Sequence, residues 1–210
     1  MNLDHIHADT ADIILSFAST ARPIIRTAYD TDSCIASTRI AVNVFHEFGL
    51  RAKPMVARMK VCNRAMAHCI EQGLITDADS LERCSEEYGA HALGIGFSNE
   101  PTPPGYWAGH LVAVVERSVL VDASADQASR PVQSIVLPGV IAETITRRFE
   151  AGLEPLVLRH RDGGVVQYHP SPRERSYRGA PDWRESSISR FIVKEIVTAM
   201  TRSLCEAKAA

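Results

Sequence analysis

The sequence predicts an α+β fold in which helices flank a cluster of antiparallel strands. Residues 111–122 and residues 155–169 each contain two short apolar runs around a polar turn, which is the pattern of a β-hairpin. Apolar residues at three- and four-residue steps mark helices in residues 34–48 and from Ser187 onward. Because the two strands of a hairpin pair antiparallel, we expect an antiparallel sheet with helices beside it.

The N-terminal segment predicts a first helix over residues 9–21. Asp9 is a suitable N-cap residue, and Pro23 is expected to end the helix because it lacks a backbone N–H. A polar loop over residues 29–33 then leads into the next helical segment.

The second helix is predicted to begin at Cys34 and to end at Gly49, a residue that readily adopts the left-handed conformation of a helix terminator. Residues 50–61 are predicted to be extended, and Pro54 indicates a sheet edge or an irregular entry into this strand. This order of elements places Cys34 at the start of a helix that is followed by a strand.

The middle of the chain, residues 63–97, looks like an insertion. Its first part, residues 63–88, has a helical pattern that is broken near Gly73, and residues 92–97 are a candidate strand. Residues 98–109 contain three prolines and predict a loop near the sheet.

The C-terminal helix is expected over residues 186–208. Its apolar stripe consists of Ile188, Ile192, Ile196, Ala199, Met200 and Leu204. The chain of 210 residues is long enough for one domain with its own core, so we interpret residues 1–210 as a single domain.

Composition excludes several classes of protein. Hydrophobic residues make up 45% of the chain, so it is not disordered as a whole. The 23 basic and 25 acidic side chains give a net charge of −2 without a Lys/Arg block, so we expect no nucleic-acid partner. No apolar run approaches the ~20 residues of a membrane span, and the acidic N-terminus lacks the basic start of a secretory signal, so we expect no membrane partner.

The cysteines are odd in number and lack paired spacing; they lie at positions 34, 62, 69, 84 and 205. We interpret them as free thiols in a reducing cytoplasm rather than as a disulfide framework. A zinc-stabilised binding module built on Cys62, Cys69 and Cys84 is an alternative, but the spacing fits no usual zinc motif.

Three residues in chain order suggest covalent catalysis by a cysteine. Cys34 opens a helix, and the N-terminal N–H groups and partial positive charge of a helix stabilise a thiolate. His110 opens the first hairpin, and Asp122 lies 12 residues later on the partner strand, where a carboxylate oxygen can reach the imidazole. We therefore predict a catalytic triad of Cys34, His110 and Asp122.

Other carboxylates compete with these roles. Glu116 in the hairpin turn and Asp126 beyond the strand are rival partners for the histidine, and both rank below Asp122 because of their positions. Asp30 and Asp32 place negative charge before the cysteine, which opposes a thiolate. Activation of the cysteine therefore depends on a charged histidine.

These motifs resemble those of the transglutaminase-like group of papain-related cysteine enzymes. The Cys34 helix leads into Gly49-Leu50-Arg51-Ala52-Lys53, which is similar to the Gly-hydrophobic-x-Ala-Arg sequence after the nucleophile helix of that group. Gly109-His110-Leu111-Val112-Ala113-Val114 and Val121-Asp122-Ala123-Ser124 resemble the strands that carry its histidine and aspartate. The resemblance covers roughly residues 28–126, and its histidine-to-aspartate run is also similar to arylamine N-acetyltransferases.

The resemblance implies a papain-like core, with a helix-borne cysteine packed on an antiparallel sheet, in a cysteine-dependent hydrolase or acyltransferase. Cys34 attacks the amide or ester carbonyl of a small-molecule, peptide or protein substrate, and the thioester then passes its acyl group to water or to an amine. No Arg-Gly-Gly precedes Cys34, so coenzyme A is not implied and no cofactor is expected. Trp107, Tyr106 and Tyr29 are the candidate substrate contacts.

The sequence leaves some alternatives open. It does not decide between hydrolysis and acyl transfer, and it carries no information on the oligomeric state. A catalytically inactive domain of the same fold, which binds a peptide or protein partner, is the main alternative to an enzyme.

Overall fold

The computed structural model describes residue 3 and residues 6–97, 107–160 and 162–209. Its helices are α1 (Ala8–Ile25), α2 (Cys34–Glu47), α3 (Arg64–Glu71), α4 (Ala78–Tyr88), α5 (Arg147–Glu150) and α6 (Ser187–Ala209), with 3₁₀ helices η1 (Ala125–Ala128), η2 (Pro131–Gln133), η3 (Ser176–Gly179) and η4 (Pro181–Trp183). Its strands are β1 (Ala52–Cys62), β2 (Ala92–Ile95), β3 (Leu111–Val115), β4 (Val119–Asp122), β5 (Ile141–Thr144), β6 (Leu156–Arg159) and β7 (Val165–Ser171). The predicted α+β class is confirmed.

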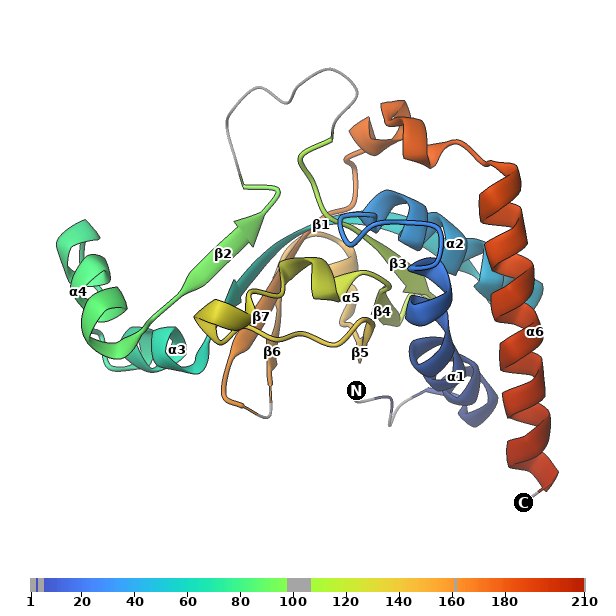
Figure 1. Ribbon diagram of the computed structural model, residues 1–210, viewed down its shortest axis with the longest axis horizontal. Coiled ribbons are helices and arrows are strands. Elements are labelled where there is room, and N and C mark those ends of the chain that lie inside the picture. Colours follow the sequence, from blue (N-terminus) through green and yellow to red (C-terminus); the bar gives the residue numbers. More distant parts are fainter. Residues whose placement is uncertain (1–2, 4–5, 98–106, 161, 210) are drawn as a thin grey trace.

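In the described part of the chain, seven strands form one curled antiparallel sheet, a half-barrel (Figure 1). The strands follow the order β5-β4-β3-β1-β7-β6, and β2 pairs with the last residues of β1. The central strand is β1, because its first half pairs with β3 and its second half with β7. Both predicted hairpins are confirmed: β3 turns into β4 at Glu116 and Arg117, which have positive φ angles, and β6 pairs with β7.

The two faces of this sheet are packed differently. On one face, called the helix-bearing face below, α1, α2 and α6 pack over β3, β4 and the start of β1 (Figure 1). The opposite face is covered by a second apolar cluster that includes Phe149 and Tyr168. Side chains alternate along β1: Met55 and Ala57 belong to this second cluster, whereas Val56 packs near the start of α2.

Two expectations for α1 are wrong. His7 occupies the N-cap position, and Asp9 lies in the first helical turn. Pro23 does not end the helix, which continues to Ile25. Because Ile25 is fully buried in the apolar cluster beneath the helices, its packing offsets the backbone bond that the proline cannot donate.

The helix that carries Cys34 follows the prediction. It begins at Cys34, and Gly49 follows its end with a φ of 74°, the expected left-handed conformation. Pro54 lies in the central strand rather than at a sheet edge. At its position β1 pairs only with β3, since β7 joins from Val56 onward, so one side of the strand can accommodate a residue without an N–H.

The segment between β1 and β3 contains α3, α4 and β2, which extend to one side of the sheet (Figure 1). The predicted break near Gly73 is confirmed, because α3 ends at Glu71 and Gly73 has a φ of 66°. The predicted loop over residues 98–109 lies mostly outside the described residues.

The C-terminal helix begins at Ser187, as predicted, and buries Ile192, Ile196 and Met200 against the other helices. The prediction that Ile188 belongs to the buried stripe is wrong, since this residue is 56% exposed. The start of the helix is held instead by polar bonds between Ser186 and Ser189. Among the described helices, none is long and apolar enough to cross a membrane.

Replacing Ile196 with alanine is expected to lower the free energy of unfolding by about 2–5 kcal/mol, because a fully buried side chain leaves a cavity. The matched change Ile188→Ala is expected to cost less than about 0.5 kcal/mol, because that side chain lies mostly in solvent. Urea unfolding of both variants measures the difference. Equal midpoints for the two variants would contradict this packing of α6.

Candidate active site

The cysteine proposed as nucleophile is the first residue of α2. Cys34 packs with Val56 of β1 and Leu111 of β3, and its Sγ lies 3.8 Å from the carbonyl oxygen of Gly109. The first N–H groups of a helix have no partner within the helix, and the helix dipole places partial positive charge there. The sulfur is therefore positioned where an anion is stabilised.

The histidine lies directly before β3 and is fully buried. His110 Nε2 lies 2.7 Å from Asp122 Oδ2, and the Cys34 side chain lies close enough to the ring to raise its pKa. The backbone carbonyl of His110 accepts a bond from the Ala57 N–H, which fixes this residue to the central strand. The structure thus brings together Cys34, His110 and Asp122.

The carboxylate of Asp122, the last residue of β4, is fully buried and fully engaged. Its Oδ2 accepts a hydrogen bond from the Tyr168 hydroxyl at 2.8 Å, in addition to the contact with His110. Its Oδ1 accepts from the backbone N–H of Ser124 at 3.0 Å. These donors stabilise the ionised carboxylate and hold it in one orientation.

The buried pair shifts the titration of both partners. Burial acts to lower the pKa of His110, but the charge and hydrogen bond of Asp122, with a contribution from Cys34, raise it to about 10. Burial acts to raise the pKa of Asp122, but His110, Ser124 and Tyr168 hold it below its ordinary value. The imidazole is therefore protonated at neutral pH.

The other ring nitrogen has a partner that the sequence did not indicate. The side-chain amide nitrogen of Gln127, in η1, lies against His110 Nδ1 and can donate to it when the ring is neutral. In that tautomer the ring proton sits on Nε2 and points at Asp122. Gln127 is only 6% exposed, and its position in the short Ala125–Ala128 helix gave no signal of this contact in the sequence.

The rival carboxylates bind elsewhere. Glu116 forms an ion pair with Arg51, with 2.6 Å between Oε2 and Nη2. Asp126 forms an ion pair with Arg22, with 2.6 Å between Oδ1 and Nη2. Among the described residues, Asp122 is thus the carboxylate that contacts the histidine.

Arg22 connects three parts of the site. Its buried guanidinium binds Asp126 next to Gln127, the carbonyl oxygen of Thr31 at 3.0 Å, and Ser37 Oγ in α2 at 3.3 Å. It thereby fixes the loop before Cys34 relative to η1. A Cβ at Gly139 would lie 2.5 Å from Arg22 Cγ, so glycine is needed there for the arginine to pass.

Aromatic residues cover the cysteine. Trp107, Tyr177 and Trp183 pack around it, and the Trp107 Nε1–H donates to Ser176 Oγ at 2.8 Å. Cys34 is only 7% exposed as a result. The Tyr177 hydroxyl is buried within this cover, and it has no hydrogen-bond partner among the described residues.

The candidate substrate contacts have different positions. Trp107 lies beside the site and packs so closely over Gly109 that a Cβ there would lie 2.1 Å from its ring. Tyr29 packs against the apolar cluster beneath the helices. Tyr106 lies outside the described residues.

The cysteines proposed as zinc ligands do not converge with other ligands. Cys69 and Cys84 are buried with Met66 and Ala90, and Cys62 packs at the edge of this cluster. In the part of the chain that the structure describes, no group of three or more His, Cys, Asp or Glu residues is placed to hold a metal.

Comparison of the chain with protein-family models, with curated proteins and with solved structures finds no match. The site is therefore interpreted from its own geometry.

The His110 ring is expected to titrate near pH 10 by NMR, and Asp122→Asn is expected to lower that pKa by removing its main charged partner. Because the pKa of His110 in the folded protein is raised above 6.5, the stabilisation that this histidine contributes is complete below that pH and is lost as the pH rises through about 10. Asp122→Asn is expected to cost about 3 kcal/mol at pH 7. As a control, Tyr168→Phe removes only one bond to the carboxylate and is expected to shift the pKa less. Titration of wild-type His110 near 6.5 would contradict the buried ion pair.

Proposed function

We propose that the protein is a thiol-dependent hydrolase or acyltransferase with a papain-like, transglutaminase-like core. The observation that carries this proposal is the buried pair of His110 and Asp122 in contact with a cysteine that begins a helix. A carboxylate–imidazole pair without access to solvent is costly to bury unless it is fully bonded. Here the carboxylate also accepts from Tyr168 and Ser124, and the cysteine lies beside the ring, an arrangement that suits covalent acyl chemistry.

In the proposed cycle, the Cys34 thiolate attacks the carbonyl carbon of an amide or ester, and a C–S bond forms. His110 gives its proton to the departing amine or alcohol as the tetrahedral intermediate collapses to a thioester. The neutral ring then takes a proton from water or from an acceptor amine, which attacks the thioester and releases the acyl group. Asp122 keeps the ring oriented and stabilises its charged form throughout.

The developing oxyanion needs hydrogen-bond donors. The backbone N–H of Cys34, in the first turn of α2, is the first candidate. One such donor typically contributes about 3 kcal/mol to the barrier reduction. The unpartnered Tyr177 hydroxyl in the cover over Cys34 is the candidate for a second donor.

The substrate is proposed to be a small molecule, peptide or protein with an amide or ester bond. Trp107, in the cover over Cys34, is the proposed contact for it. The five cysteines are free thiols in the structure, and we propose the cytoplasm as the location because a reducing compartment preserves them.

A second candidate function is a catalytically inactive domain that binds a peptide or protein partner. The observation that favours it is the cover of Trp107 and Tyr177, which leaves Cys34 only 7% exposed. In this alternative the histidine–aspartate pair acts only as a structural connection.

Acylation by 4-nitrophenyl acetate distinguishes the two functions. The enzyme is expected to release nitrophenolate in a burst and to carry one acetyl group on Cys34, located by mass spectrometry of peptides. His110→Ala is expected to slow acylation about 100-fold or more, because proton transfer by a positioned histidine contributes at least that factor.

Cys205→Ala is the matched control, because Cys205 is an exposed thiol on α6 and its removal leaves the site unchanged. Acetyl groups spread over the exposed thiols, with no preference for Cys34 and no effect of His110→Ala, would contradict the enzyme and support the inactive domain.

A further inference from the structure

In the described part of the chain, α1, α2 and α6 leave the helix-bearing face uncovered beyond the start of α2. Along β1, Val56 packs near Cys34, and Arg58, Lys60 and Cys62 follow on the same face because strand side chains alternate. Arg58 and Lys60 are exposed. Four residues of strand span about 13 Å, so this uncovered stretch begins at the cysteine and runs away from it.

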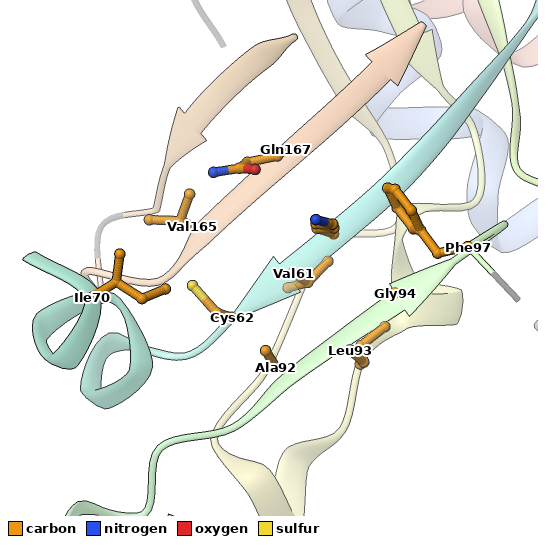
Figure 2. A pocket seen from close by; sticks show the side chains of 10 residues that line it. Val61, Cys62, Ile70, Ala92, Leu93, Gly94, Phe97, Val165 and Gln167 are labelled. Atoms are coloured by element: carbon orange, nitrogen blue, oxygen red, sulfur yellow. The ribbon is translucent and has the colours of Figure 1, made fainter. Parts of the chain in front are cut away.

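This stretch forms a groove of about 500 Å³, within the usual size range of small-molecule sites. Strands β7, β1 and β2 make its floor, Ile70 of α3 lies near one end, and Phe97 lies near the other (Figure 2). It is lined by Lys60, Val61, Cys62, Ile70, Ala92, Leu93, Gly94, Phe97, Val165 and Gln167. Most of these side chains are apolar, so the groove can bury the apolar body of a ligand.

The charged side chains at the groove, Lys60 and Arg58, are both positive. Lys60 is the single charged residue in its lining, and Arg58 lies next to it. Both cations lie over the Phe97 ring, with Lys60 Nζ 4.8 Å and Arg58 Cζ 5.3 Å from its centroid. Neither cation takes part in the ion pairs formed among the described residues, and the lining contains no carboxylate.

A neutral polar group lies beside the cations. His169 of β7 pairs with Arg58 in the sheet, and its ring packs roughly perpendicular to that of Phe97, with 5.4 Å between the ring centroids. Its Nε2 is shielded from solvent and has no hydrogen-bond partner among the described residues. Burial and the two cations lower the pKa of His169, which favours the neutral ring, so this side chain adds no negative charge beside Arg58 and Lys60.

The groove adjoins the proposed nucleophile through two glycines. A Cβ at Gly96 would lie 3.0 Å from Arg58 Cγ and 3.4 Å from Gly109 Cα, so these three residues meet. The carbonyl oxygen of Gly109 is in turn 3.8 Å from Cys34 Sγ. A molecule bound over Arg58 and Lys60 therefore lies next to the residues that surround the sulfur.

We propose that this groove binds a small organic anion with an apolar body, held by Arg58 and Lys60 at its charged group and by Phe97, Ile70 and Val165 along its body. That this anion is the part of the substrate next to the reacting carbonyl rests on the proposed function. The substrate class is then an anionic, partly apolar amide or ester.

Three probes with the same apolar chain and different head groups test the ligand class: octanoate, octanamide and octylammonium. Each is titrated into the full-length, ¹⁵N-labelled protein while the amide signals of Lys60, Gly94 and Gln167 are followed. Octanoate is expected to bind most tightly at these residues, and octylammonium most weakly. Lys60→Gln is expected to weaken octanoate binding about two- to fivefold, the range for one exposed charge contact.

Two further variants control this result. Lys53→Gln makes the same change on the same strand but on its opposite face, and it is expected to leave octanoate binding unchanged. Ala92→Trp fills the groove from an exposed position of β2 and is expected to abolish binding. Equal affinity for the three probes would overturn the proposal. So would an affinity for octanoate that is unchanged in both Lys60→Gln and Ala92→Trp.

Competition connects the groove with the reaction. Octanoate is expected to slow the acylation of Cys34 by 4-nitrophenyl acetate. The concentration that gives half of this inhibition is expected to equal the dissociation constant measured by NMR, and Lys60→Gln is expected to raise both by the same factor. Octanoate that saturates the groove without slowing acylation would overturn the connection. If no ester acylates Cys34, the proposed function fails, but the titration of the three probes still decides whether the groove binds organic anions.

Discussion

The buried ion pair of His110 and Asp122 is the interaction on which the rest of the site depends. It joins the start of β3 to the end of β4, and Tyr168 adds β7 from across the half-barrel. A charged pair in an apolar interior is stable only when its remaining hydrogen-bonding positions are filled, and here Tyr168 and Ser124 donate to the carboxylate. The sheet therefore fixes the position of the imidazole, whereas the helices fix the position of the sulfur.

A second buried charge holds the helices relative to the sheet. Arg22 extends from α1 to the loop before Cys34, to α2 and to Asp126 beside Gln127. The nucleophile and the partner of the histidine ring are thus fixed by one guanidinium. In the described part of the chain, Cys34 at the start of α2 packs near Val56 of β1, and the groove lies further along the same face of this strand.

The sequence was sufficient for the local elements and for one long-range relation. Hydrophobic spacing predicted α2, both hairpins and the start of α6, and the 12-residue separation across the first hairpin predicted that Asp122 reaches His110. It failed where tertiary packing decides: α1 continues past Pro23 because Ile25 is buried, and Ile188 is exposed because polar bonds hold the start of its helix. The roles of Arg22 and Tyr168 could not be assigned, because Asp126 lies 104 residues from Arg22 and Asp122 lies 46 residues from Tyr168. The role of Gln127 depends on the 3₁₀ helix η1, which the sequence did not predict.

In the proposed function, a charged His110 makes Cys34 a nucleophile. The most direct test of this role is the rate of alkylation by limiting iodoacetamide between pH 6 and 8, with Cys34 and the exposed Cys205 compared in the same sample by mass spectrometry. We expect the ratio of the Cys34 rate to the Cys205 rate to increase as the pH is lowered, and we expect His110→Ala to abolish this increase. A ratio that is independent of pH, or one that is unchanged in His110→Ala, would contradict the account.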